Sequence, residues 1–197
     1  MITSKQNNTA IGNIRLFGNV RVMIISGLFV SLSIILGKFL QIPIGDSIRI
    51  SFENLPIIMA GIFFGPFVGG AVGIGADLIG CLLKGYAINP IITLGAMSIG
   101  FMSGLVHMLM AKKKPDSCIT GFLSVFPAVF SAHIIGSMMI KSIGLYVYYH
   151  TPLEVLMCRI PIYTAIALLE SIIISSLLIN KAFFNQLEKV CNYGNKL

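Results

Sequence analysis

Three groups of ionisable and polar side chains stand in otherwise apolar stretches of the sequence. Within each group the spacing places the residues on one face of an α-helix. The groups are Asp77, Cys81 and Lys84; His133, Ser137 and Lys141; and Arg159, Tyr163 and Glu170. Charged groups are costly in apolar surroundings and are retained where they meet a partner, water or a ligand. We therefore interpret the three faces as walls of one polar site.

Basic residues are predicted at the outer mouth of this site. Four of them fall at the ends of predicted helices or in adjoining loops: Arg49, Lys84, Lys141 and Arg159. Such a ring would attract an anion, and a carboxylate in particular, because arginine can grip it with two hydrogen bonds. The alternative for each residue is that its long side chain only reaches the lipid headgroups.

Other polar groups lie deeper. At 1.5 Å per residue, Asp77 is about 10 Å below Lys84, and His133 is about 12 Å below Lys141. A pocket that is basic at its mouth and acidic below suits a ligand that is anionic at one end and donates hydrogen bonds at the other. For Asp77, a structural pair with His133 or Lys84 is the competing interpretation. Glu170, nearer the midplane, is equally consistent with helix packing.

Two residues of the outer loops complete the candidate substrate-binding set. Asn89 precedes Pro90 in a short loop, and Tyr146 belongs to the segment "GLYVYYHTP". The tyrosine is equally well explained as an interfacial anchor.

Motifs for several chemistries are missing from the sequence. It contains no G-x-x-x-x-G-K-[ST] phosphate loop, no H-E-x-x-H and no G-x-S-x-G. Its 4 cysteines have no zinc-like spacing. We therefore expect no enzyme, no metal and no cofactor. The net charge of +7 is expected to report membrane orientation rather than nucleic-acid binding.

The elements that position these residues are predicted to be membrane helices. The chain has 56% hydrophobic and only 11% charged residues, whereas soluble domains carry about a quarter charged residues. Its mean hydropathy is +0.91. The apolar runs have helix length and lack the alternation of barrel strands. The sequence thus predicts an all-α, multi-pass protein of the cell membrane, in contact with the lipid bilayer.

The run from Leu55 to Leu83 decides the number of crossings. It is too long for one ordinary span, and Gly65-Pro66 interrupts it. A helical hairpin there gives six crossings and places both tails and Lys112–Lys114 on one side. That side then collects most of the basic residues, as the positive-inside tendency requires, whereas a single kinked helix would split them.

We therefore predict a six-transmembrane-helix bundle with both termini cytoplasmic. Residues 1–197 form a single membrane domain, in which residues 1–19 are a polar cytoplasmic tail. The helices are expected at about 20–39, 51–64, 67–84, 91–111, 119–141 and 159–181.

Three segments resemble the substrate-binding S components of energy-coupling factor (ECF) vitamin transporters, and within them the folate-type members. They are residues 48–100, beginning "IRISFENLPIIMAGIFFGPFVGG"; residues 132–149, "AHIIGSMMIKSIGLYVYY"; and residues 159–171, "RIPIYTAIALLES". The loop "GYAINPIITLG" departs from the "PGFTLS" form of many folate-type members.

The resemblance implies a high-affinity folate pocket in the outer half of the bundle. It also implies a membrane coupling subunit (EcfT-type) and two cytoplasmic ATPases (EcfA-type) that energise uptake. The family docks through small residues spaced four apart on the first helix, and Gly27 and Ser31 stand at the matching place. Folate suits the pocket inferred from the residues, because its glutamate tail carries two carboxylates and its pterin edge carries adjacent donors.

Two alternatives to folate remain open at this point. One is an S component for another vitamin or precursor, such as thiamine or a pyrimidine. The other is a structural membrane protein whose polar residues only pack its helices.

Overall fold

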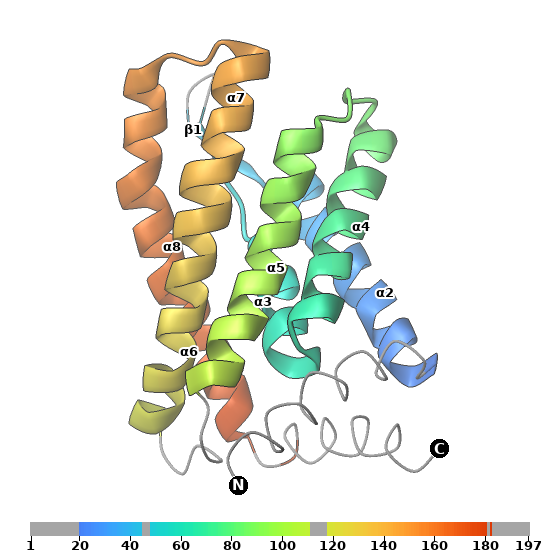
Figure 1. Cartoon of the computed structure of the whole chain (residues 1–197), viewed down its shortest axis with the longest axis vertical. Helices are drawn as coiled ribbons and strands as arrows, with labels where there is room; N and C mark the ends of the chain where they lie inside the picture. Colours follow the sequence, from blue (N-terminus) through green and yellow to red (C-terminus); the bar gives the residue numbers. More distant parts are fainter. Residues whose placement is uncertain (1–19, 45–47, 111–117, 181, 183–197) are drawn as a thin grey trace, which may run out of the picture.

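Helices that alternate in direction form the bundle in the computed structural model, which describes residues 20–44, 48–110, 118–180 and 182 (Figure 1). The start of α2, the end of α8 and the facing ends of α5 and α6 lie at one end of the bundle. We call this the lower end. The predicted tails and Lys112–Lys114 fall outside the described residues.

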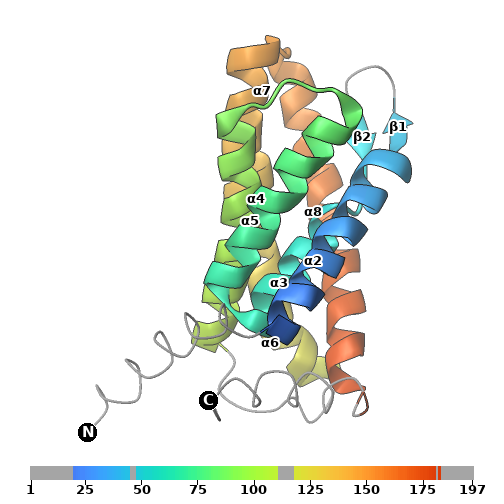
Figure 2. The same cartoon turned by 90° about the vertical axis from the view of Figure 1, so that its right-hand side faces the viewer.

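The first helix, α2 (Val20–Ile34), continues as the π-helix η2 (Ile35–Phe39). It is followed by a feature that the sequence analysis did not predict. Residues expected to form a loop in an all-α fold pair as two short antiparallel strands, β1 (Ile42–Ile44) and β2 (Ile48–Ile50), at the upper end (Figure 2). Isoleucine at both ends of each strand favours this pairing, since β-branched residues suit extended backbone.

The predicted break at Gly65-Pro66 is confirmed. Helix α3 (Asn54–Phe64) ends at Gly65, whose φ of 95° is readily adopted only by glycine. Pro66 then begins α4 (Pro66–Lys84), where its missing N–H costs nothing. The two helices run in opposite directions in Figure 2, and Gly69 lies against the backbone of Gly61.

Glycines also bring α4 against α5 (Pro90–Met110). A methyl group added at Gly100 would collide with the Gly69 carbonyl, and one added at Gly73 would collide with the Ala96 carbonyl. Small residues permit such close backbone approach in membrane helices. The α3–α4–α5 side of the bundle is therefore packed backbone against backbone.

The last two helices are longer than predicted. One continuous helical rod comprises α6 (Cys118–Ala132), the π-helix η3 (His133–Ile140) and α7 (Lys141–Tyr149). After a turn at His150, whose φ is 48°, α8 (Leu153–Ile179) returns. The helices predicted over 119–141 and 159–181 left residues 142–158 as a loop, and this prediction is wrong. The rod continues to Tyr149 and α8 begins at Leu153, so only the turn at His150 separates them.

Among the described residues, five helices are long and apolar enough to cross a membrane, and the shorter helix α3 is apolar as well. α3 is also almost wholly buried, because nine of its 11 residues, including Asn54, are shielded by the neighbouring helices. The predicted helical membrane architecture is thus confirmed in outline.

Candidate functional site

A chain of polar contacts runs through the buried interior of the bundle. At its upper end, Lys141 Nζ donates to Glu53 Oε1 over 3.0 Å and to Asn54 Oδ1 over 3.3 Å. The Asn54 amide in turn donates to Ser137 Oγ over 3.2 Å. Lys141 is only 7% exposed and Asn54 1% exposed. The start of α3 is therefore joined to η3 and α7 by contacts largely withdrawn from solvent.

The lower end of this chain joins η3 to α8. Ser137 Oγ lies 3.3 Å from His133 Nδ1, and His133 Nε2 lies 2.7 Å from Glu170 Oε2. Both His133 and Glu170 are fully buried. In the part of the chain that the structure describes, Glu170 Oε1 has no hydrogen-bond partner. The imidazole is thus the structural partner of Glu170.

Asp77 has a partner that sequence reasoning missed. Thr93 Oγ1, in the first turn of α5, donates to Asp77 Oδ2 over 2.6 Å. Within the described residues Asp77 makes no hydrogen bond or ion pair with His133 or Lys84, the two structural partners considered from the sequence. A threonine in an apolar helix does not stand out in the sequence as the partner of a carboxylate. The signal that could have indicated it is its place in the first turn of α5, the helix that packs against α4.

Asp77 and Lys141 line the same cavity. It has a volume of about 20 Å³ and is also lined by Glu53, Ser33 and four apolar residues from α2, α3, α4 and α5. A space of this size admits about one water molecule. The carboxylates of Glu53 and Asp77 and the Lys141 ammonium therefore share one small polar compartment.

The described side chains of the predicted basic ring do not come together as a ring. Lys141 belongs to the interior and not to the mouth, because its side chain reaches inward to α3. Lys84 is exposed, with Nζ 4.5 Å from the centre of the Phe39 ring. Arg49 lies on β2, and its side chain is outside the described part of the structure.

Arg159 reaches the interior through Tyr163. Its guanidinium donates to Tyr163 Oη over 3.2 Å and lies 5.1 Å from the ring centre. The Tyr163 ring is 5.6 Å from the His133 imidazole. Three of the predicted site residues are therefore brought together, with Arg159 as the outermost.

Asn89 has a local role. Its Oδ1 accepts the backbone N–H groups of Ile91 at 3.0 Å and Ile92 at 3.4 Å, and the residue is 4% exposed. Asn89 thus caps the amino end of α5, a structural role that the sequence analysis did not assign to it.

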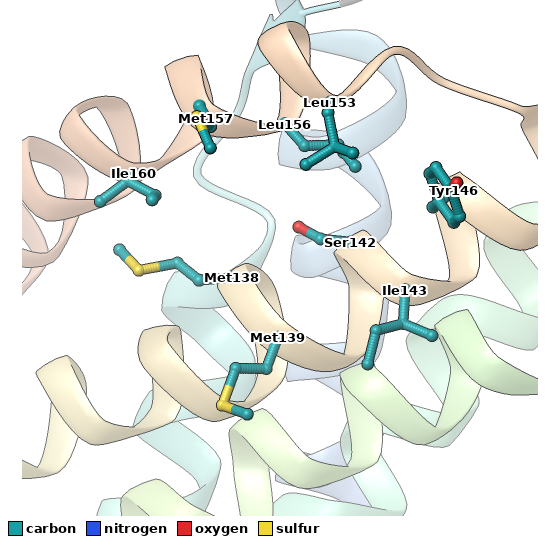
Figure 3. Close-up of a pocket in the computed structure, with 9 residues that line it drawn as sticks. All are labelled: Met138, Met139, Ser142, Ile143, Tyr146, Leu153, Leu156, Met157 and Ile160. Carbon is teal, nitrogen blue, oxygen red and sulfur yellow. The ribbon is translucent and has the colours of Figure 1, made fainter.

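A second and larger cavity of about 530 Å³ lies between the η3–α7 rod and α8 (Figure 3). Met138, Ser142 and Tyr146 line one wall, and Leu153 and Met157 line the other. Its lining is almost entirely apolar, and its volume is in the range of small-molecule sites. It is a groove open to the surroundings, because Tyr146, Leu153 and Met157 are each more than half exposed. Tyr146 contributes to this cavity from a helix and not from a loop.

Gly27 and Ser31 lie on the exposed face of α2. A methyl group added at Gly27 would meet nothing within 4 Å, and Ser31 Oγ donates to the Gly27 carbonyl over 3.0 Å. Large apolar side chains of the same face are also exposed, including Met23, Ile24 and Leu28.

Residues 21–187 match the family described as ECF transporter, substrate-specific component. The chain belongs to this family. It is accordingly a multi-pass cell-membrane protein that forms a component of a transporter, a class of protein that is not an enzyme.

Individual relatives agree with this family assignment. The folate transporter FolT of Clostridium novyi (strain NT) is 41% identical over 66 residues, which are 32% of this chain and 37% of that relative. The match therefore spans little more than a third of the relative's length.

Two solved structures share the fold of this S component. A FolT bound with folic acid aligns with a TM-score of 0.53 at 20% identity, over 86% of this chain and 94% of that one. The S component of a bacterial ECF transporter aligns with a TM-score of 0.54 at 18% identity, over 85% of this chain and 95% of that one.

Proposed function

We propose that this chain is the high-affinity folate-binding S component of an ECF transporter. It takes up folate together with a membrane coupling subunit and two cytoplasmic ATPases, which supply the energy. The sequence itself has no phosphate-binding loop with which to use ATP. The bundle crosses the membrane six times with both termini cytoplasmic, so that the β1–β2 end faces outward.

The observation that carries this proposal is the pairing of two unlike cavities at the outer half of the bundle. The polar cavity presents Asp77, Glu53 and Lys141, and the apolar cavity lies across the η3–α7 rod from it. Folate combines an aromatic pterin and benzoyl body with a dicarboxylate tail, so it needs apolar walls, an acceptor for the pterin N–H groups and cations for the tail.

In this proposal each predicted residue has a role. Asp77 accepts hydrogen bonds from N–H groups of the ligand, Arg159 and Lys141 bind carboxylates, and Tyr146 and Tyr163 flank the rings. His133 holds Tyr163 in place through ring contact. Lys84 and Arg49 attract the anion at the outer mouth, and Asn89 acts by fixing the loop between α4 and α5.

The proposal is tested by binding measurements on purified Asp77→Asn and Arg159→Ala proteins. Each variant should lose about tenfold or more in folate affinity, because each loses a charge-assisted hydrogen bond. Glu154→Gln, an exposed change on α8, is the matched control. If both site variants keep folate affinity within a few-fold of the unsubstituted protein, the ligand lies elsewhere.

A second candidate is an S component for another vitamin or precursor. It is favoured by the loop "GYAINPIITLG", which departs from the folate-type form, and by the short span of the FolT match. Mass spectrometry of the ligand that remains bound through gentle purification separates the two. A purely structural protein would carry no ligand and would not co-purify with ATPases.

A further inference from the structure

The Lys141 ammonium is held in one position by several elements. A methyl group added at Gly95 of α5 would come within 2.6 Å of Lys141 Cγ, so the lysine stem lies directly against the α5 backbone. Its Nζ contacts Asn54, which is itself held by Ser137. The side chain of Lys141 is 9% exposed. This cation therefore cannot turn outward to meet an anion.

Its partner Glu53 is differently placed. Glu53 immediately precedes α3, and its side chain is 27% exposed, three times the fraction for Lys141. Its backbone is fixed, because the Glu53 carbonyl accepts a hydrogen bond from Ser33 Oγ over 2.7 Å. The Glu53 carboxylate is therefore reached by water, whereas the Lys141 ammonium is nearly withdrawn from it.

Glu53 also fills the space beside the lysine. A methyl group added at Gly37 would come within 2.6 Å of both Glu53 Cβ and Oε2, so the side chain lies tightly against the end of α2. With Glu53 in place the shared cavity has only about 20 Å³. A ligand group larger than water can reach Lys141 only if Glu53 departs.

We propose that Lys141 is a carboxylate-binding site occupied in the ligand-free protein by the chain's own Glu53, which a ligand carboxylate displaces. The exchange replaces one carboxylate by another, so the buried ammonium remains paired and the charge of the compartment is unchanged. Glu53 thereby competes with the ligand and selects for anionic ligands. The identity of that ligand as folate rests on the proposed function, but the exchange itself does not.

Chemical rescue tests the site without folate. Glu53→Ala should lower the midpoint of thermal unfolding in detergent, and sodium acetate should restore most of that loss, because acetate fits the space left by the carboxylate. Sodium chloride at equal ionic strength should not restore it. Acetate should leave the unsubstituted protein, Glu154→Ala and the double variant Glu53→Ala, Lys141→Met unchanged. Equal effects of acetate and chloride on Glu53→Ala would overturn the proposal.

Competition is tested with the milder change Glu53→Gln, which keeps the shape and a hydrogen bond to Lys141. Folate should bind this variant about tenfold more tightly, because the competent state is no longer masked by an internal carboxylate. Hydroxymethylpterin, which has no carboxylate, should bind both proteins equally. Unchanged or weaker folate binding to Glu53→Gln would refute competition. If the unsubstituted protein binds no folate, the proposed function fails, and the acetate experiment still decides the inference.

Discussion

The two sides of this bundle differ in how their helices meet. On the α3–α4–α5 side, Gly61, Gly69 and Gly100 bring backbones into contact, so the helices pack closely there. On the other side, α7 and α8 stand apart at the upper end and line the apolar cavity of about 530 Å³, which is open to the surroundings (Figure 3). The α3–α4–α5 side, which we call the closed side, holds Asp77 and Thr93 in place. The α7–α8 side, which we call the open side, provides space for a ligand.

The polar chain lies between these two sides. It links Asn54 at the start of α3, through Lys141 and His133 on the long rod, to Glu170 on α8. A ligand that changed the contacts of Lys141 would therefore act on the Lys141–Glu53 ion pair, which ties the long rod to the start of α3. We infer that the closed side supplies stability and the open side supplies the ligand space.

The largest predicted effect is on the closed side. Gly100→Val should abolish folded protein, because its side chain would collide with the backbone of Gly69, which cannot shift independently of α4. Gly100→Ala should cost about 1–3 kcal/mol of stability through overpacking. The readouts are the yield of monodisperse protein in detergent and the midpoint of thermal unfolding.

Gly70→Ala is the matched control for this prediction. Its added methyl would lie 3.5 Å from the Met97 side chain, an ordinary contact. It should leave both readouts nearly unchanged. If Gly100→Val folds as well as Gly70→Ala, the backbone contact between α4 and α5 does not hold the closed side together.

The next largest effect is on the link to α8. Glu170→Ala should destabilise the protein by about 1–3 kcal/mol, because His133 Nε2 would lose its buried partner. The measurement is the midpoint of thermal unfolding, followed by circular dichroism. Glu154→Ala, an exposed change on the same helix, should have no measurable effect. Equal midpoints for the two variants would show that the buried pair contributes nothing.

Local signals in the sequence predicted much of this architecture. Gly65-Pro66 breaks a helix wherever it stands, because glycine supplies the positive φ and proline lacks the N–H, so the helical hairpin was predictable. The spacing of His133, Ser137 and Lys141 correctly indicated one face, although a π-helix carries it. Long apolar runs identified the spanning helices.

Features that depend on distant contacts were not predictable. Glu53 is 88 positions from Lys141, and nothing near it in the sequence marks it as the partner of a buried cation. From the sequence alone, Lys141 is indistinguishable from a lysine that contacts lipid headgroups. Only the packing of α3 beside α7 shows that it is buried. The extent of α7 and α8 was missed because "GLYVYYHTP" has the composition of an interfacial loop, whereas the structure carries both helices to the turn at His150.

A smaller effect on stability, but a clear one on binding, is predicted for the open side. Ser142→Trp would fill part of the apolar cavity, whose wall Ser142 lines. Folate affinity should fall about tenfold or more through steric exclusion, while the thermal midpoint should change little because the site is already open. Ile172→Trp, at a residue of α8 that is 55% exposed, controls for adding an indole. Unchanged affinity in Ser142→Trp would remove the apolar cavity from the proposed site.

The smallest effect on the isolated protein is predicted for Gly27 on α2, a residue that lines neither cavity. Gly27→Leu should leave thermal stability and folate affinity unchanged, because an added side chain there meets nothing within 4 Å. The same substitution should abolish co-purification with the coupling subunit, since close helix approach requires a small residue at the contact. Ile172→Phe, a change at an exposed residue of α8, should preserve co-purification. If Gly27→Leu still assembles, the partner contacts a different face, and the smallness of Gly27 and Ser31 has no part in docking.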